Sequence, residues 1–183
     1  ISFGAPAVFE SAYTAHVSAT YTTNGKVVIA YRDGGNSNYG TAIVGTVSGT
    51  SISFGSAVVF DTAESTYTST IYDPTNQKVV IAYRANGNSN YGTAIVGTVS
   101  GTSISFGSAT VYSSANTPYN STTYDSTNQK VVIAYRDGGN SNYGTGIVYS
   151  PVTMSTNLTS ENYIGISNGA YSNGQTATVQ VTG

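Results

Sequence analysis

The sequence predicts an all-β protein made of repeated four-stranded antiparallel units. The heptapeptide Lys26–Arg32 returns as Lys78–Arg84 and as Lys130–Arg136, so the repeat spacing is 78 − 26 = 130 − 78 = 52 residues. Valine, isoleucine, threonine and tyrosine, which favour strands, are abundant, and no segment has the 3.6-residue apolar period of a helix. The apolar runs in the middle of each copy do not alternate with polar residues, which is typical of strands buried on both faces.

Three copies fill most of the chain, and a segment of different sequence follows them. Each copy begins with Ile-Ser-Phe-Gly, at Ile1, Ile52 and Ile104. The predicted organisation is repeat 1 at 1–51, repeat 2 at 52–103, repeat 3 at 104–150 and a C-terminal β connector at 151–183. Because the first residue is isoleucine, we expect a processed product or a fragment of a longer protein.

The second copy illustrates the expected order of elements. Its four strands are expected at 52–60, 67–72, 78–84 and 91–99. The second strand ends in the turn Asp73–Gln77, in which Pro74 fixes φ and Asp73 caps the turn. The loop at 85–90 consists of turn-forming residues.

The buried central strands predict that neighbouring copies cover one another. One 52-residue sheet cannot bury its own two faces, so each copy must pack on the next. Face-to-face stacking of four-stranded antiparallel units favours a β-propeller-like array of blades. A three-fold β-trefoil or β-prism is the alternative, because propellers usually have at least four blades and only three copies are present. Further blades, several chains or the 151–183 segment would have to complete a ring.

The composition excludes several classes of protein. With 6 Lys+Arg, 8 Asp+Glu and a net charge of −2, the chain lacks the positive charge of an ordinary nucleic-acid binder. It has no cysteine, which excludes disulfides, thiolate metal sites and a cysteine nucleophile. It has no apolar run long enough for a membrane-spanning helix. We expect neither a metal nor a cofactor.

The loop after the third strand resembles a degenerate Asp-box, the turn found in sialidase-type propellers. Asp33, Gly35 and Ser37 match the Ser-x-Asp-x-Gly-x-Thr-Trp pattern, and the third copy repeats the match. The second copy has Ala85 in the aspartate position. This resemblance implies a folding element outside any catalytic centre.

The whole chain resembles the repeat regions of structural and tail-fibre proteins of marine bacteriophages. The repeated Ile-Ser-Phe-Gly-Ser-Ala and Lys-Val-Val-Ile-Ala-Tyr-Arg stretches and the closing segment 157–181 are typical of them. The resemblance implies a component of a virion or extracellular fibre, with other copies of the chain or virion proteins as partners.

Repeated loop residues are the candidate binding site for a glycan. They are Tyr39, Tyr91 and Tyr143, Asn38, Asn90 and Asn142, and Arg32, Arg84 and Arg136. Sugar recognition combines an apolar ring with amide and hydroxyl groups, and repetition of a weak site adds avidity. The alternatives are that the tyrosines pack between copies and that the arginines flank a buried strand and point to water.

Other residues are weaker candidates for a catalytic, metal-binding or glycosylation site. The arginines are also candidates for a sialidase-like carboxylate clamp, and carboxylates held roughly 5–10 Å apart would suit glycoside hydrolysis. His16 is expected in a variable surface loop without repeat partners, and the Asp-Gly-Gly-Asn loops are expected to form turns rather than a Ca²⁺ site. Asn120 and Asn157 begin glycosylation sequons.

These observations favour a non-enzymatic structural and adhesive module of a phage tail fibre or other extracellular fibre, which binds host-surface glycan. No catalytic residue is assigned. The alternative is a filament subunit without a ligand, joined to its neighbours by strand-edge addition. A sialidase-like glycoside hydrolase is the third hypothesis.

Overall fold

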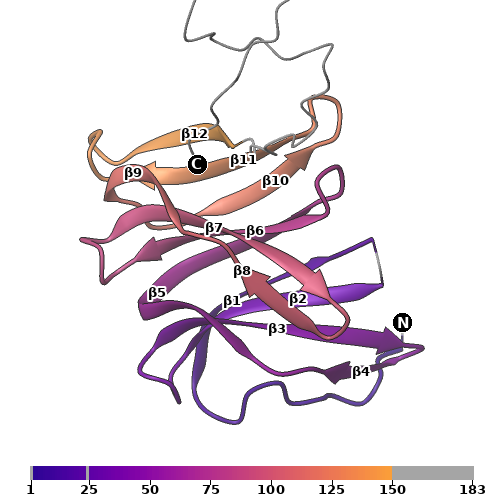
Figure 1. Cartoon of the computed structure of the whole chain (residues 1–183). Helices are drawn as coiled ribbons and strands as arrows, with labels where there is room; N and C mark the ends of the chain where they lie inside the picture. The colour runs from indigo at the N-terminus through magenta and orange to yellow at the C-terminus, as the bar shows by residue number, and fades with distance from the viewer. Residues whose placement is uncertain (1, 24, 150–183) are drawn as a thin grey trace, which may run out of the picture. The chain divides into compact units, whose positions relative to one another are not determined.

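The computed structural model describes residues 2–23 and 25–149, and this part of the chain is all-β, as predicted (Figure 1). The expectations for 151–183, including the connector and Asn157, lie outside the described residues. No helix in the described part is long and apolar enough to cross a membrane. The strands are β1 (Thr14–Tyr21), β2 (Lys26–Asp33), β3 (Tyr39–Ser48), β4 (Ser51–Phe54), β5 (Val58–Asp73), β6 (Lys78–Ala85), β7 (Tyr91–Ser100), β8 (Ser103–Phe106), β9 (Thr110–Asn116), β10 (Ser121–Asp125), β11 (Lys130–Asp137) and β12 (Tyr143–Tyr149).

Each repeat forms the same three-stranded antiparallel meander. The meanders are β1–β2–β3, the second half of β5 with β6 and β7, and β10–β11–β12. Their central registers are identical, with Ile29 opposite Ile43, Ile81 opposite Ile95, and Ile133 opposite Ile147. The three copies therefore adopt one conformation in their central strands.

The predicted first strand, 52–60, is divided between two strands. The hairpin strand β4 pairs with the end of β3, and β5 begins only at Val58. The first half of β5 pairs with the start of β3 and its second half pairs with β6, so this 16-residue strand links two repeats. Asp61 and Glu64 lie within β5.

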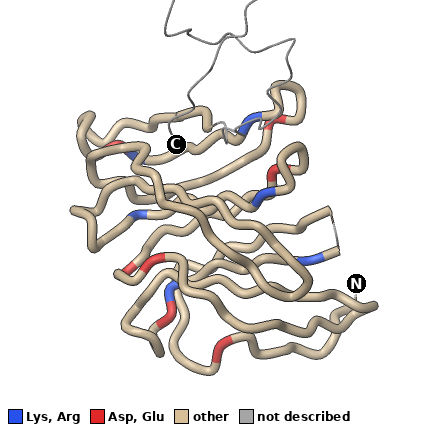
Figure 2. Tube along the Cα trace, in the orientation of Figure 1, with Lys and Arg blue, Asp and Glu red and all other residues tan. Residues whose placement is uncertain are grey.

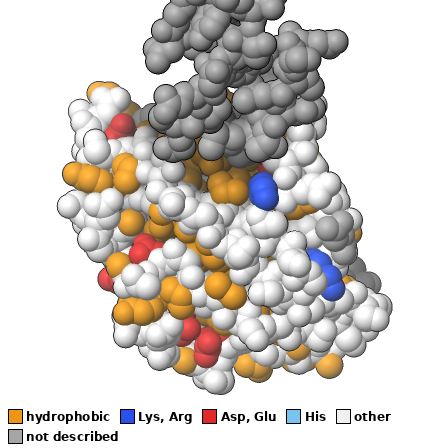
Figure 3. Space-filling model, in the orientation of Figure 1, with side chains coloured by type: hydrophobic (Ala, Val, Ile, Leu, Met, Phe, Trp, Pro, Cys, Tyr) orange, Lys and Arg blue, Asp and Glu red, His pale blue; other side chains and the backbone are white. Residues whose placement is uncertain are grey.

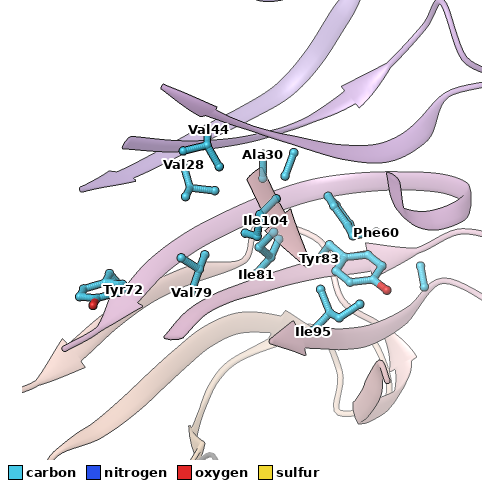
Figure 4. Close-up of a cluster of buried hydrophobic side chains, with 12 residues drawn as sticks. Val28, Ala30, Val44, Phe60, Tyr72, Val79, Ile81, Tyr83, Ile95 and Ile104 are labelled. Atoms are coloured by element: carbon cyan, nitrogen blue, oxygen red, sulfur yellow. The ribbon is translucent and has the colours of Figure 1, made fainter. Parts of the chain in front are cut away.

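The antiparallel sheet curls so that successive repeats pack on one another (Figure 1). Val28 and Val44 of the first repeat share a buried cluster with Val79 and Ile81 of the second (Figure 4). A second cluster joins the opposite face of β6 to the third repeat, with the members Val80, Ala82, Ala94, Val131, Ile133 and Tyr135.

Strand β6 is consequently covered on both faces, as its unbroken apolar sequence predicted. Val79, Val80, Ile81 and Ala82 are all fully buried. The hydrophobic effect therefore acts across both repeat boundaries rather than within any one sheet.

The two ends of the stack differ from its middle. In the first repeat, the ring centres of Phe9 and Tyr31 are 5.1 Å apart. The 2–13 segment therefore covers part of the outer face of this repeat. In the third repeat, Ala134 is exposed and Val148 is 62% exposed, although Ala82, the counterpart of Ala134, is buried.

Candidate functional site

The loops after β2, β6 and β11 owe their shape to turn chemistry. Asp33 Oδ1 accepts a 2.9 Å hydrogen bond from the Gly35 backbone N–H, and Asp137 does the same for Gly139. The two residues before the next strand have positive φ in every copy, namely Ser37, Asn38, Ser89, Asn90, Ser141 and Asn142. Asp33 and Asp137 therefore support the loop backbone, but the aspartate is not required for its shape, because the second copy has Ala85 and the same positive φ values.

The predicted site tyrosines open β3, β7 and β12, but their environments differ. Tyr39 and Tyr91 are half-buried, whereas Tyr143 is 62% exposed. The difference arises because Tyr39 lies opposite Glu64 of the next repeat and Tyr91 lies opposite Asn116. No described residue pairs with the corresponding edge at Tyr143.

The predicted site asparagines take part in the connection between repeats through their backbones. The carbonyl of Asn38 accepts a 3.3 Å hydrogen bond from the Ser65 N–H, and that of Asn90 accepts one of 3.3 Å from Thr117. Asn142, in the third copy, is exposed. The loops after β2 and β6 therefore hold the following repeat through their backbones.

Each arginine lies over a tyrosine ring. The guanidinium carbon of Arg84 is 4.9 Å from the ring centre of Tyr67, and that of Arg136 is 5.2 Å from Tyr119. Arg32 is 5.7 Å from the Tyr13 ring and forms a 2.7 Å ion pair with Glu64. The arginines are thus already engaged by the protein, in cation–π contacts spread along the stack.

Charged side chains are few, and the lysines and arginines occupy the same strand positions in each copy (Figure 2). The lysines begin β2, β6 and β11, and the arginines lie near the opposite ends of the same strands. Lys26 donates a 2.8 Å hydrogen bond to Thr46, and Lys78 donates one of 2.7 Å to Thr98.

A row of rings in tilted and edge-to-face contact crosses the repeats beside the arginines, and the sequence did not predict it. His16, Tyr67 and Tyr119 occupy equivalent positions with φ of 53°, 52° and 62°. The His16 and Tyr67 ring centres are 5.0 Å apart, and those of Tyr67 and Tyr119 are 5.1 Å apart. We call these three residues the ring ladder.

The prediction that His16 lies in a surface loop without repeat partners is wrong. His16 lies in β1, next to an irregularity in the pairing with β2, and Tyr67 stands at the same irregularity in β5. An alignment of the copies with a one-residue gap would have revealed the match, because the first copy is one residue shorter before its lysine.

The environment of the ring ladder favours the neutral form of His16. Burial lowers the pKa of His16, and the nearby Arg32 and Arg84 guanidinium groups lower it further.

Burial raises the pKa of Tyr83, and the neighbouring Asp61 carboxylate adds to this effect. Tyr31 and Tyr112 have raised pKa values, again chiefly through burial.

The remaining candidates have structural roles. Asp73 Oδ1 accepts hydrogen bonds of 3.0 and 3.1 Å from the Thr75 and Asn76 N–H groups, which confirms the predicted turn. The side chain of Asn120 accepts a 2.8 Å hydrogen bond from the Tyr112 hydroxyl and donates one of 3.1 Å to the Tyr67 carbonyl. The amide of this sequon is thus engaged within the protein.

The described residues contain neither an enclosed pocket nor a group of three His, Asp or Glu side chains suited to a metal ion. Comparison with models of known protein families, with curated proteins and with solved structures gave no match. The candidate site therefore consists of the loop residues and the ring ladder, of which Tyr119 and Tyr143 are exposed and His16, Tyr39, Tyr67 and Tyr91 are half-buried.

Proposed function

We propose that the chain is a non-enzymatic structural and adhesive module of a virion or extracellular fibre, in which the repeats act as blades of a β-propeller-like array. The observation that supports this proposal most is the repetition of one interface at both repeat boundaries. Thr70 N–H donates a 2.9 Å hydrogen bond to Ser18 Oγ, and Thr122 N–H donates one of 2.9 Å to Ser69 Oγ.

A second polar link repeats at the other end of the strands. The hydroxyls of Tyr72 and Thr23 are 3.0 Å apart, and those of Tyr124 and Thr75 are 2.6 Å apart. Apolar clusters between the same repeats add non-directional stabilisation, while these hydrogen bonds fix the relative position of the copies. A stack of this kind suits a stiff spacer.

The surface suits an extended extracellular protein. On the face shown in Figure 3, uncharged polar groups and backbone surround scattered apolar side chains, and charged side chains are few. Such a surface is hydrated through hydroxyl and amide groups. Because it carries few charges, screening by salt has little effect on its interaction with water.

The loops after β2, β6 and β11 support the adhesive part of the proposal. Each copy has a tyrosine at the start of a strand, beside an Asn-Ser-Asn turn, and in the third copy this tyrosine, Tyr143, is 62% exposed. An aromatic face with neighbouring amides suits a sugar ring, and repetition along the stack lets weak sites act together on a multivalent glycan.

A glycan array tests this function, with Tyr143→Leu and Tyr143→Phe as a matched pair. Tyr143 is the most exposed of the three site tyrosines, so its replacement leaves the core intact. We expect Tyr143→Leu to lower apparent affinity for a multivalent glycan about tenfold and Tyr143→Phe to retain it. The absence of binding to any multivalent sugar would contradict the adhesive role.

A further inference from the structure

The third meander of the chain has an edge that is covered in the other two repeats. The outer edges of β3 and β7 pair with the start of the following repeat in the same register, with Thr41 opposite Val59 and Thr93 opposite Val111. Among residues 2–23 and 25–149, none pairs with the outer edge of β12.

Beside Gly144, on this edge, there is open space in which a side chain of another segment could pack. We call this space the Gly144 socket. A Cβ at Gly92 would lie 2.5 Å from the Tyr112 ring, and a Cβ at Gly40 would clash with the Phe60 ring. Gly144 is the equivalent residue in β12, and a Cβ there would meet nothing within 4 Å. The structural reason for glycine at the first two positions is the ring of the next repeat, and at Gly144 that ring is missing from the described part of the chain.

The segment 2–13 contains the matching ring. It is the counterpart of 53–64, which places Phe9 at the position of Phe60, but it forms no strand in the described structure. Two of its apolar side chains are largely solvated, since Phe3 is 92% exposed and Val8 is 79% exposed.

The faces at the two ends of the stack are complementary in the same way. Tyr21 is 63% exposed, whereas its counterpart Tyr72 is 9% exposed and hydrogen-bonds to Thr23. In the third repeat, the counterpart of Thr23 and Thr75 is Thr127, which is exposed. Each end of the stack thus presents one half of a contact that the chain makes twice within itself.

We propose that one copy of this chain binds a second copy head to tail, so that the 2–13 segment and the β1–β3 meander of one copy dock on β12 and the outer face of β10–β12 of the other. The proposal rests on the structural function above and names the partner that this function needs. The internal registers place Val8 opposite Thr145 and Phe9 in the Gly144 socket. A head-to-tail contact of this kind builds rings or open filaments rather than a symmetric pair.

Two substitutions make this contact weaker than the internal ones. Tyr149 stands where β3 and β7 have Gly45 and Gly97, next to the position that Phe3 would take. Val17 replaces the hydrogen-bonding Thr68 and cannot donate to the Tyr119 carbonyl. We therefore expect association that depends on concentration.

Disulfide trapping tests the register directly, because the chain has no cysteine of its own. Val8→Cys and Thr145→Cys chains, mixed and mildly oxidised, should yield a mixed dimer about tenfold faster than the mixture of Val8→Cys with Tyr143→Cys, which is out of register. Equal rates for the two mixtures, or no mixed dimer, would overturn the proposal.

Gly144→Leu tests the socket by sedimentation velocity over a range of concentrations. The wild type should gain mass as concentration rises, and Gly144→Leu should remain a monomer with an unchanged unfolding midpoint. A wild type that is monomeric at every concentration, or equal association of the variant, would overturn the proposal. Glycan binding by the monomeric variant separates this outcome from failure of the adhesive function, because the loops are unaltered.

Discussion

At the scale of single residues, the ring ladder shows how the repeat boundary stabilises an uncommon backbone conformation. His16, Tyr67 and Tyr119 have positive φ, which is uncommon for residues other than glycine and costs about 1–3 kcal/mol when it is strained. The carbonyls of the first two accept hydrogen bonds from the following copy, Thr68 Oγ1 to His16 and Asn120 Nδ2 to Tyr67. The contacts between the rings and these hydrogen bonds offset the strain.

His16→Tyr should therefore stabilise the protein in mild acid. The pKa of His16 in the folded state lies below its ordinary value of 6.5, so below about pH 6.5 the unfolded chain binds more protons and stability falls as the pH falls. Tyrosine, which occupies the other two ladder positions, removes this loss. Urea unfolding at about pH 7.5 and pH 5 measures the effect.

If the free energy of unfolding changed with pH in the same way for the wild type and for His16→Tyr, this account of His16 would be wrong. The comparison is internal, because the other titrating groups are the same in both proteins.

The buried tyrosines predict the opposite dependence in alkali. The raised pKa of Tyr83 means that its contribution to stability is fully present below the ordinary pKa of 10.0 and is lost as the pH rises above it. Tyr83→Phe should make the decline between about pH 9 and pH 11 shallower in denaturant titrations. An unchanged slope would show that Tyr83 does not ionise on unfolding.

At the scale of the strands, the glycines on the outer edges of β7 and β12 differ in what covers them. Gly92→Leu should lower the free energy of unfolding by about 1–3 kcal/mol, because the new side chain meets the Tyr112 ring. Gly144→Leu should change it by less than about 0.5 kcal/mol in dilute solution. Equal effects in denaturant unfolding would mean that β9 does not cover β7.

The same face of the central strand in the second and third repeats gives a second matched pair. Val80 is fully buried between the second and third repeats, whereas Val132, its counterpart in the third, is half-buried. We expect Val80→Ala to cost about 2–3 kcal/mol of unfolding free energy and Val132→Ala less than about 1 kcal/mol. A larger cost for Val132→Ala would contradict the order of stacking.

The strands differ in how far their sequences predicted them. The unbroken apolar run Val79–Tyr83 correctly predicted a strand covered on both faces. The division of 52–60 was not predictable, because it depends on tertiary contacts: Gly55 N–H bonds to the Val44 carbonyl at 2.9 Å, and a Cβ at Gly55 would clash with the Thr102 backbone.

The candidate site was predictable in its loops and not in its ring ladder. The Asn-Ser-Asn turns follow from local residue preferences, so their positions were clear from the sequence. The contact between the His16 and Tyr67 rings depends on the fit between copies, and the change of residue type hid the equivalence. The unequal exposure of Tyr39 and Tyr143 also depends on the neighbouring repeat, which no local pattern encodes.

At the scale of the whole molecule, stability is distributed over boundaries between copies. Each boundary combines a buried apolar cluster with the same polar links, and no copy buries both faces of its sheet alone. In such an array the free energy of unfolding is a sum of repeat and boundary contributions, so it grows with the number of copies.

Insertion of a second copy of 52–103 after residue 103 tests this stacking most directly, because the inserted repeat meets the same partners on both sides. Equilibrium unfolding in urea should remain a single transition, with a higher midpoint and an m-value about a third larger. Separate transitions, or a midpoint and m-value equal to those of the original chain, would show that the repeats fold independently of one another.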